Sequence, residues 1–250
     1  MARSARLKFV VAYDGTPFAG WQSQRGGNTV QDHLERAFAV VIGRPRRIHG
    51  AGRTDAGVHA LAQTAHVDLP DRAIDAHKWP GALNASLPPQ IRVLRSTYVS
   101  EKFHARFSAR GKIYRYRIWH DRVLPPFEVG RSWLVPAPLD FPAMETEATA
   151  FLGRHDFASF AANRGTPETD TRRTITRVTL RAKGKAMTVE IAGDGFLYKM
   201  VRLMVGALVR RGSGQAAAGE IRTRLLHPER VSPARLVAPA AGLLLVRVIY

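Results

Sequence analysis

The sequence predicts an α+β protein made of two related α/β units, whose largely antiparallel, mixed sheets pack side by side around a basic cleft. Three observations support this class. Strand-like and helix-like segments alternate without the strict rhythm of a doubly wound fold, each half contains a strand, a helix and further strands, and no dinucleotide-binding or Walker glycine motif occurs. We expect residues 1–108 to form the first domain and residues 109–250 to form the second.

The first half opens with an apolar, β-branched segment at residues 7–13, which predicts a strand ending at turn residues 14–17. A helix is predicted over residues 29–42, because Thr29 and Asp32 form a capping pattern ahead of apolar residues at helical spacing. The remaining expected elements are a strand at 62–69, a helix at 74–87, a strand at 91–98 and a connector at 103–108.

The second half opens with alternating residues at 112–119, which predict a strand. A helical stripe that includes Leu197 and Val201 follows a pair of glycines and predicts a helix at or after them. The other expected elements are a long loop at 121–138, a helix at 141–152, a polar loop at 164–173, a hairpin of 174–180 with 187–191, a short helix at 216–226 and a final strand at 243–250.

The most informative stretch is the glycine-rich loop Gly50–Ala60, in which Arg53 precedes Asp55 by two residues. Glycines allow a backbone to approach a bulky ligand closely, and a nearby cation favours the ionised form of a carboxylate. The alternative is an ordinary surface turn with an exposed ion pair that has little energetic consequence.

Composition narrows the choice of partner. The 250 residues include 38 Lys and Arg against 20 Asp and Glu, which gives a formal net charge of +18. Such an excess favours a polyanionic partner, and nucleic acid fits better than a membrane because the basic residues are interleaved throughout the chain. The absence of cysteine excludes disulfides, thiolate nucleophiles and cysteine-ligated metals.

Apolar patterning points to a cytoplasmic protein that does not insert into membranes. No segment reaches the roughly 18–20 apolar residues of a membrane span, and the apolar run near the N-terminus contains Lys8 and lacks a signal-peptide cleavage site.

Several residues permit two interpretations. Trp21 and Gln22 would suit stacking and hydrogen bonding to nucleotides, although a tryptophan is equally able to fill the core. On the strand at 112–119, Tyr114 lies on an aromatic face and Arg115 on a basic face. Such a strand could bind single-stranded RNA through rings and cations, or it could be a half-buried strand with an aromatic core face and a solvated arginine face. Arg202 lies one residue from an apolar helical stripe, where it would be a ligand contact or a solvated side chain.

These stretches together resemble the tRNA pseudouridine synthase A family over essentially the whole chain. The motif around Asp55 is the most specific of them. The matching segments are Tyr13–Thr16, Phe18–Gln22, Thr29–Gln31, Gly52–Ala60, Phe103–Arg106, Tyr114–Tyr116, His155–Phe157, Met200–Arg202 and Gly242–Leu243.

The resemblance implies isomerisation of uridines 38–40 in the anticodon stem-loop of tRNA by a homodimer without metal or cofactor. It implies that Asp55 is the catalytic aspartate and that Tyr114 packs against the target base. It also implies that Arg202 is the basic partner of the carboxylate and that Arg53 displaces or replaces the base. The loop at 164–171 does not align with the family pattern.

Two other functions compete with this one. A non-catalytic RNA-binding or chaperone protein would need only the positive charge and the interleaved aromatic residues. A metal-dependent RNA hydrolase would use Asp55, His59 and His66, but a hard cation prefers several carboxylates.

Overall fold

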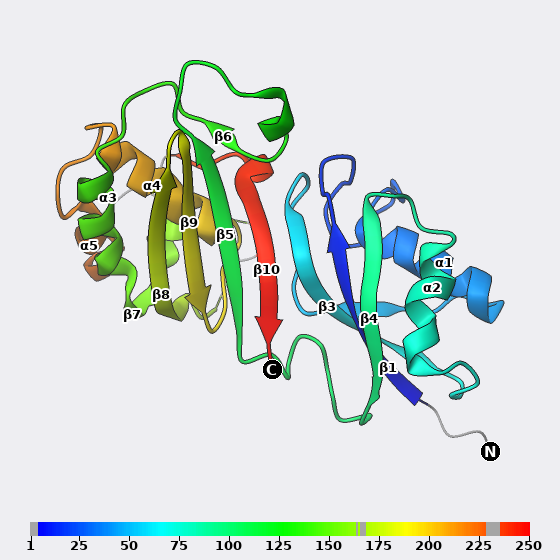
Figure 1. The fold of residues 1–250 in the computed structure, drawn as a ribbon. Coiled ribbons are helices and arrows are strands. Elements are labelled where there is room, and N and C mark those ends of the chain that lie inside the picture. Colours follow the sequence, from blue (N-terminus) through cyan, green and yellow to red (C-terminus); the bar gives the residue numbers. More distant parts are fainter. Residues whose placement is uncertain (1–4, 164, 166–168, 229–235) are drawn as a thin grey trace. The chain divides into compact units, whose positions relative to one another are not determined.

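The computed structural model describes residues 5–163, 165, 169–228 and 236–250. Its chain separates into two compact units (Figure 1). The first contains the residues up to Arg110 together with Leu244–Tyr250, and the second contains Gly111–Leu243. The C-terminal strand is thus part of the first unit, whereas the sequence-based division assigns it to the second domain; that division stays a prediction.

The first unit is built on a mixed sheet with the strand order β4-β1-β3-β10. Strand β1 (Ala5–Tyr13) runs antiparallel to both β3 (His59–Leu69) and β4 (Ile91–Val99). The short strand β2 (Ile48–Gly50) pairs antiparallel with β3. Strand β10 (Leu243–Ile249) adds the parallel pairing, with Leu244 beside His59.

Helix α1 (Val30–Ile42) confirms the predicted cap. Thr29 Oγ1 accepts a hydrogen bond from the backbone N–H of Asp32 at 3.2 Å, and the Asp32 carboxylate accepts one from the N–H of Thr29 at 3.2 Å. Such reciprocal bonds satisfy donors that the first helical turn cannot pair. The helix predicted at 74–87 is shorter than expected, with a 3-10 turn at Ala76–Lys78 followed by α2 (Trp79–Asn84).

The second unit has the strand order β5-β9-β8-β7, and every pairing along this order is antiparallel. These strands are β5 (Gly111–Trp119), β9 (Ala186–Gly193), β8 (Arg172–Lys183) and β7 (Gly153–Asp156). A two-residue strand, β6 (Trp133–Leu134), pairs in parallel with β5. The two units therefore confirm an α+β fold with largely antiparallel, mixed sheets.

Among its described residues, the second unit has the α-helices α3 (Phe141–Ala148), α4 (Met200–Gly212) and α5 (Glu220–Leu226). Helix α4 runs behind β5, β9 and β8 in the view of Figure 1. The buried side chain of Glu147 binds the start of α5, where it accepts hydrogen bonds from the backbone N–H groups of Gly219 and Ile221, each at 3.0 Å. A carboxylate here satisfies unpaired helical donors and complements the helix dipole.

Several predicted boundaries shift by a few residues in this unit. Helix α3 ends at Ala148, where the sequence predicts a helix to 152, and α5 begins at Glu220, where it predicts a start at 216. Strand β8 begins at Arg172, so the end of the predicted polar loop at 164–173 is extended backbone that pairs with β7. Residues 164 and 166–168 of that loop lie outside the described residues. Helix α4 begins at Met200, after the two glycines as predicted, and Lys199 just before it adopts a left-handed conformation with φ of 58°.

No helix in the described ranges is both long enough and apolar enough to cross a membrane.

A buried histidine distinguishes the sheet of the first unit. His66 is 1% exposed, and its Nδ1 accepts a hydrogen bond from the backbone N–H of Ala105 at 3.1 Å. Its ring stacks on His49 with centroids 5.1 Å apart. Burial, followed by the positive charge of Arg6 and the neighbouring His104 and His49, lowers the pKa of His66 to about 4.

Stability should therefore fall in weak acid. The unfolded chain binds a proton at His66 below about pH 6.5, whereas the folded chain binds it only near pH 4. The contribution of neutral His66 to the free energy of unfolding is therefore complete above about pH 6.5 and is lost as the pH falls towards 4. One such group changes the free energy of unfolding by at most about 1.4 kcal/mol per pH unit. Urea unfolding between pH 7 and 4 should show a shallower loss for His66→Asn, which keeps an acceptor, than for the wild type or for exposed His77→Asn. Parallel curves for all three proteins would contradict this assignment.

Candidate active site

The Asp55 loop lies between β2 and β3 of the first unit, and hydrogen bonds to β3 hold the backbone of its first residues. The N–H of Ala51 donates to the carbonyl of Thr64 at 2.8 Å, and Gln63 Nε2 donates to the carbonyl of Gly52 at 2.9 Å. A tight turn closes the loop, since the N–H of Val58 donates to the carbonyl of Asp55 at 3.1 Å. Asp55 itself is partly buried.

Thr54, the residue before Asp55, is buried and held by two segments of the Tyr13–Gln22 region. Its hydroxyl shares a 2.8 Å hydrogen bond with that of Tyr13, and its carbonyl accepts one from the N–H of Trp21 at 3.0 Å. The two anchors fix the peptide that leads into Asp55.

Three glycines allow this packing. A Cβ at Gly20 would lie 2.7 Å from the carbonyl oxygen of Thr54, and φ at Gly20 is +92°, which favours glycine. A Cβ at Gly15 would collide with the backbone of Val58, and one at Gly50 would lie 2.5 Å from the ring of Trp21. Gly15 and Gly20 thus bring backbone against backbone next to Asp55, and Gly50 makes room for the ring of Trp21.

Trp21 is a core residue, so its interpretation as a nucleotide-stacking side chain is wrong. The side chain is 2% exposed and lies against Gly50 and the ring of Tyr13. Because aromatic burial and aromatic stacking use the same residue type, the sequence could not separate these roles.

Arg53 lies in the same loop, two residues before Asp55, and is exposed. Its Nε donates to Gln22 Oε1 at 3.2 Å, and Gln22 Nε2 donates to Oε1 of the buried Gln31 at 2.7 Å. Arg53 is therefore an accessible cation. Its Nε is held by the side-chain amide of Gln22, which is held in turn by that of the buried Gln31.

Tyr114 and Arg202, the other two residues expected at the site, belong to the second unit. Tyr114 lies on β5, is 8% exposed and packs edge-on against Phe196 with centroids 5.1 Å apart. Arg202 lies on α4, where its Nε donates to the carbonyl of Ala238 at 2.6 Å. Asp55 and Arg53 thus share one loop of the first unit, and Tyr114 and Arg202 lie on two elements of the second.

Lys199 is a residue that the sequence did not single out. Among the described residues it is the one non-glycine with positive φ, and it directly precedes α4. A left-handed conformation costs a residue with a Cβ roughly 1–2 kcal/mol, and such outliers concentrate at functional sites. A sequence pattern carries no signal for the backbone dihedral angles of a lysine, so only the tertiary structure reveals this conformation.

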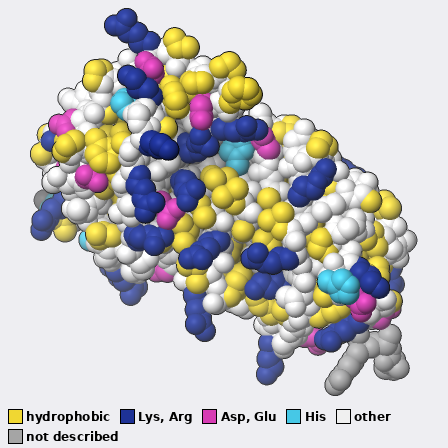
Figure 2. Space-filling view, in the orientation of Figure 1, with side chains coloured by type: hydrophobic (Ala, Val, Ile, Leu, Met, Phe, Trp, Pro, Cys, Tyr) yellow, Lys and Arg dark blue, Asp and Glu magenta, His cyan; other side chains and the backbone are white. Residues whose placement is uncertain are grey.

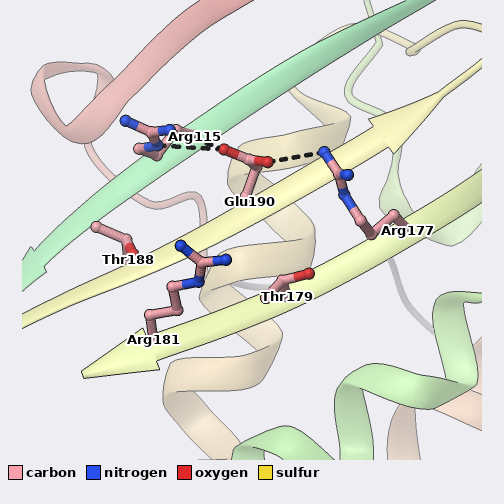
Figure 3. Close-up of a pocket in the computed structure, with 6 residues that line it drawn as sticks. All are labelled: Arg115, Arg177, Thr179, Arg181, Thr188 and Glu190. Atoms are coloured by element: carbon pink, nitrogen blue, oxygen red, sulfur yellow. Dashed lines mark hydrogen bonds and ion pairs between the residues drawn. The ribbon is translucent and has the colours of Figure 1, made fainter.

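The arginines of β5 lie on the opposite face of the sheet from the tyrosines. Arg115 and Arg177 both pair with Glu190, at 2.9 and 2.8 Å (Figure 3). They border an outer hollow of about 300 Å³, lined by Arg115, Arg177, Thr179, Arg181, Thr188 and Glu190. Since Tyr116 is fully buried and Tyr114 nearly so, the strand has an aromatic core face and an ion-paired outer face, not one mixed surface. Figure 2 shows lysines and arginines spread widely over the face in view, with acidic groups between them.

The proposed metal ligands do not form a site. His59 Nδ1 accepts a hydrogen bond from the N–H of Gly15 at 3.1 Å, and His66 Nδ1 is occupied by Ala105. Within the part of the chain that the structure describes, no group of three or more His, Cys, Asp or Glu residues is placed to hold a metal ion. The metal-dependent hydrolase hypothesis therefore lacks its ligand cluster.

The packing beneath Asp55 predicts that Gly20→Ala is destabilising. The added methyl group meets the Thr54 carbonyl in a strained backbone conformation, and overpacking of this kind costs about 1–3 kcal/mol. Urea unfolding would measure the loss against Gly26→Ala, since a Cβ at Gly26 meets no atom within 4 Å. Equal stability of the two variants would refute the close approach.

Comparison with known proteins places these motifs in a family. A family model described as tRNA pseudouridine synthase matches residues 9–108 and 148–250. The chain is 48% identical over 254 residues to tRNA pseudouridine synthase A of Akkermansia muciniphila, covering 98% of this chain and 95% of that protein. It is 47% identical over 257 residues to the enzyme of the same name from Solidesulfovibrio magneticus, covering 98% and 91%.

Among solved structures, the crystal structure of a Cbf5-Nop10-Gar1 complex has only a weak likeness, with a TM-score of 0.41 and 10% identity over 96% of this chain and 49% of that one. The sequence matches are decisive by themselves, because they extend over nearly the whole chain at high identity. The chain belongs to the tRNA pseudouridine synthase family, whose members isomerise uridine to pseudouridine in tRNA.

Proposed function

We propose that this pseudouridine synthase modifies uridines 38–40 of the anticodon stem-loop, with Asp55 as its catalytic carboxylate. One observation carries the assignment of Asp55. Asp55 is a partly buried residue, and the residue before it, Thr54, is fixed by Tyr13 and Trp21. A reacting group needs such preorganisation because displacement by about 1 Å can cost roughly 100-fold in rate. The anticodon specificity rests on the resemblance to tRNA pseudouridine synthase A.

The reaction needs a group that holds the substrate fragment while the base turns. The N1–C1′ glycosidic bond breaks, uracil rotates and C5 bonds to C1′. The C5 hydrogen is released as a proton and N1 takes up a proton, so the product is an isomer of the substrate. An ionised aspartate can attack C1′, attack C6 or remove the 2′ proton, and all three routes use the same carboxylate. Hydrolysis of a glycosidic bond uses two carboxylic groups so that water can be activated, whereas an isomerisation must exclude water. A single motif carboxylate fits the isomerisation.

Tyr114, Arg202 and Arg53 complete the proposed site. Extruding a base from a stem-loop costs a few kcal/mol, which contact with the ring of Tyr114 would partly offset. Arg53, as an exposed cation of the same loop, would occupy or open the space that the base leaves. The charge of Arg202 would favour the ionised form of Asp55.

We further propose that the enzyme is a cytoplasmic homodimer whose positive clefts bind tRNA. The net charge of +18 supports contact with a polyanion, and the dimer rests on the family resemblance. Light scattering should give twice the 27.6 kDa chain mass.

Asp55→Asn tests the catalytic assignment. With tRNA tritiated at uridine C5, the variant should release tritium to water at least about 1000-fold more slowly, because the amide cannot act as nucleophile or base. Its affinity for tRNA should stay near that of the wild type. Asp75→Asn, on an exposed residue of the same unit, is the matched control and should react normally. Turnover near the wild-type rate, or an equal loss of binding, would rule out this role.

Two substitutions separate stacking from hydroxyl chemistry at Tyr114. Tyr114→Phe keeps the ring and should retain most activity, whereas Tyr114→Leu removes it. A stacked base is worth about 1–3 kcal/mol, so the leucine variant should lose roughly 5- to 150-fold in kcat/KM for tritium release. A larger loss in the phenylalanine variant would instead assign the function to the hydroxyl.

A further inference from the structure

The backbone of residues 236–239, here called the bracing segment, lies along α4 in the second unit. Three hydrogen bonds hold it. The N–H of Ala238 donates to the carbonyl of Arg202 at 3.2 Å, and Arg202 Nε donates back to the carbonyl of Ala238 at 2.6 Å. The hydroxyl of Tyr116 on β5 donates to the carbonyl of Pro239 at 2.7 Å. The bracing segment therefore links the strand that carries Tyr114 to the helix that carries Arg202.

Gly206 determines how closely the bracing segment approaches α4. A Cβ at this position would collide with the carbonyl oxygen of Leu236. Gly206 lies four residues after Arg202, one helical turn along α4, so both residues face the same side of the helix. Alanine is the better helix former, which makes a glycine in the middle of α4 unfavourable unless this contact needs it.

Tyr116 holds the C-terminal end of the bracing segment, at Pro239. It is fully buried, and Gly242 packs against its ring, where a Cβ would lie 2.5 Å away. Burial raises the pKa of Tyr116 above its ordinary value, although the charge of Arg202 opposes the shift, so the hydroxyl remains a proton donor to Pro239.

We propose that the bracing segment orients the guanidinium of Arg202 for reaction, and that Gly206 and Tyr116 are positioning residues which set the place of that segment. The inference rests on the proposed role of Arg202 as partner of Asp55. An arginine pairs well with a carboxylate only when the plane of its guanidinium is correctly directed. Anchoring Nε to a backbone carbonyl fixes that plane before substrate binds. The side-chain entropy is therefore lost during folding and not in the reaction.

Gly206→Ala tests the inference directly. The methyl group should displace the bracing segment and lower kcat for tritium release by about 10- to 100-fold, with KM for tRNA nearly unchanged. Gly212→Ala is the matched control on the same helix, because its added Cβ crowds the buried side chain of Met144 and not the backbone of the bracing segment. If folded Gly206→Ala kept the wild-type kcat and were more stable, as helix propensity alone predicts, the inference would be overturned.

Tyr116→Phe provides a second test that adds no bulk. It removes only the hydrogen bond to Pro239, and we expect a several-fold loss of kcat without a change in KM. Hydrogen exchange of the Arg202 Nε–H, followed by NMR, gives a readout independent of activity. Exchange should be faster in both variants than in the wild type and in Gly212→Ala, and unchanged exchange in both would contradict the inference.

Arg202→Ala separates this inference from the function on which it depends. A wild-type kcat in Arg202→Ala would overturn both the role proposed for Arg202 and its positioning. A large loss in Arg202→Ala, with wild-type kcat in both Gly206→Ala and Tyr116→Phe, would overturn the positioning inference alone.

Discussion

The contact of Thr54 with Tyr13 and Trp21 is the constraint on which the first unit's candidate site depends. One hydroxyl and one backbone donor fix the peptide before Asp55, while glycines at 15 and 20 remove the side-chain atoms that would keep the segments apart. A buried polar residue is favourable only when its groups are paired, so the same bonds that make Thr54 tolerable in the core also hold the loop in one conformation.

In the second unit, too, hydrogen bonds to a segment that is remote in sequence hold a residue proposed to act on RNA. Arg202 and Tyr116 both direct donors at carbonyls of residues 236–239, a stretch remote from them in sequence. A long cation on a helix would otherwise sample many rotamers, and it is restrained here by backbone groups that cannot rotate away. In both units, therefore, residues proposed to act on RNA are held by segments that have no proposed chemical role.

Charge and aromaticity are separated by the alternation of β5. The tyrosines are buried in the core, whereas Arg115 pairs with Glu190 on the outer face. Exposed pairs of this kind contribute little to stability, and their arginines are partly neutralised. The strongly positive composition is consequently a poor guide to the location of the site, even though it correctly indicates a polyanionic partner.

Local patterns allowed the sequence alone to determine the α+β class, the Thr29 cap of α1, the alternation of β5 and the family. Each of these depends on neighbours within a few residues or on a continuous motif such as that around Asp55. Tertiary structure alone decided that Trp21 fills the core, that β10 pairs with β3, and that residues 236–239 reach Arg202. Such contacts join residues far apart in the chain, and a tryptophan, a strand or a backbone carbonyl carries no local mark of the partner it will meet.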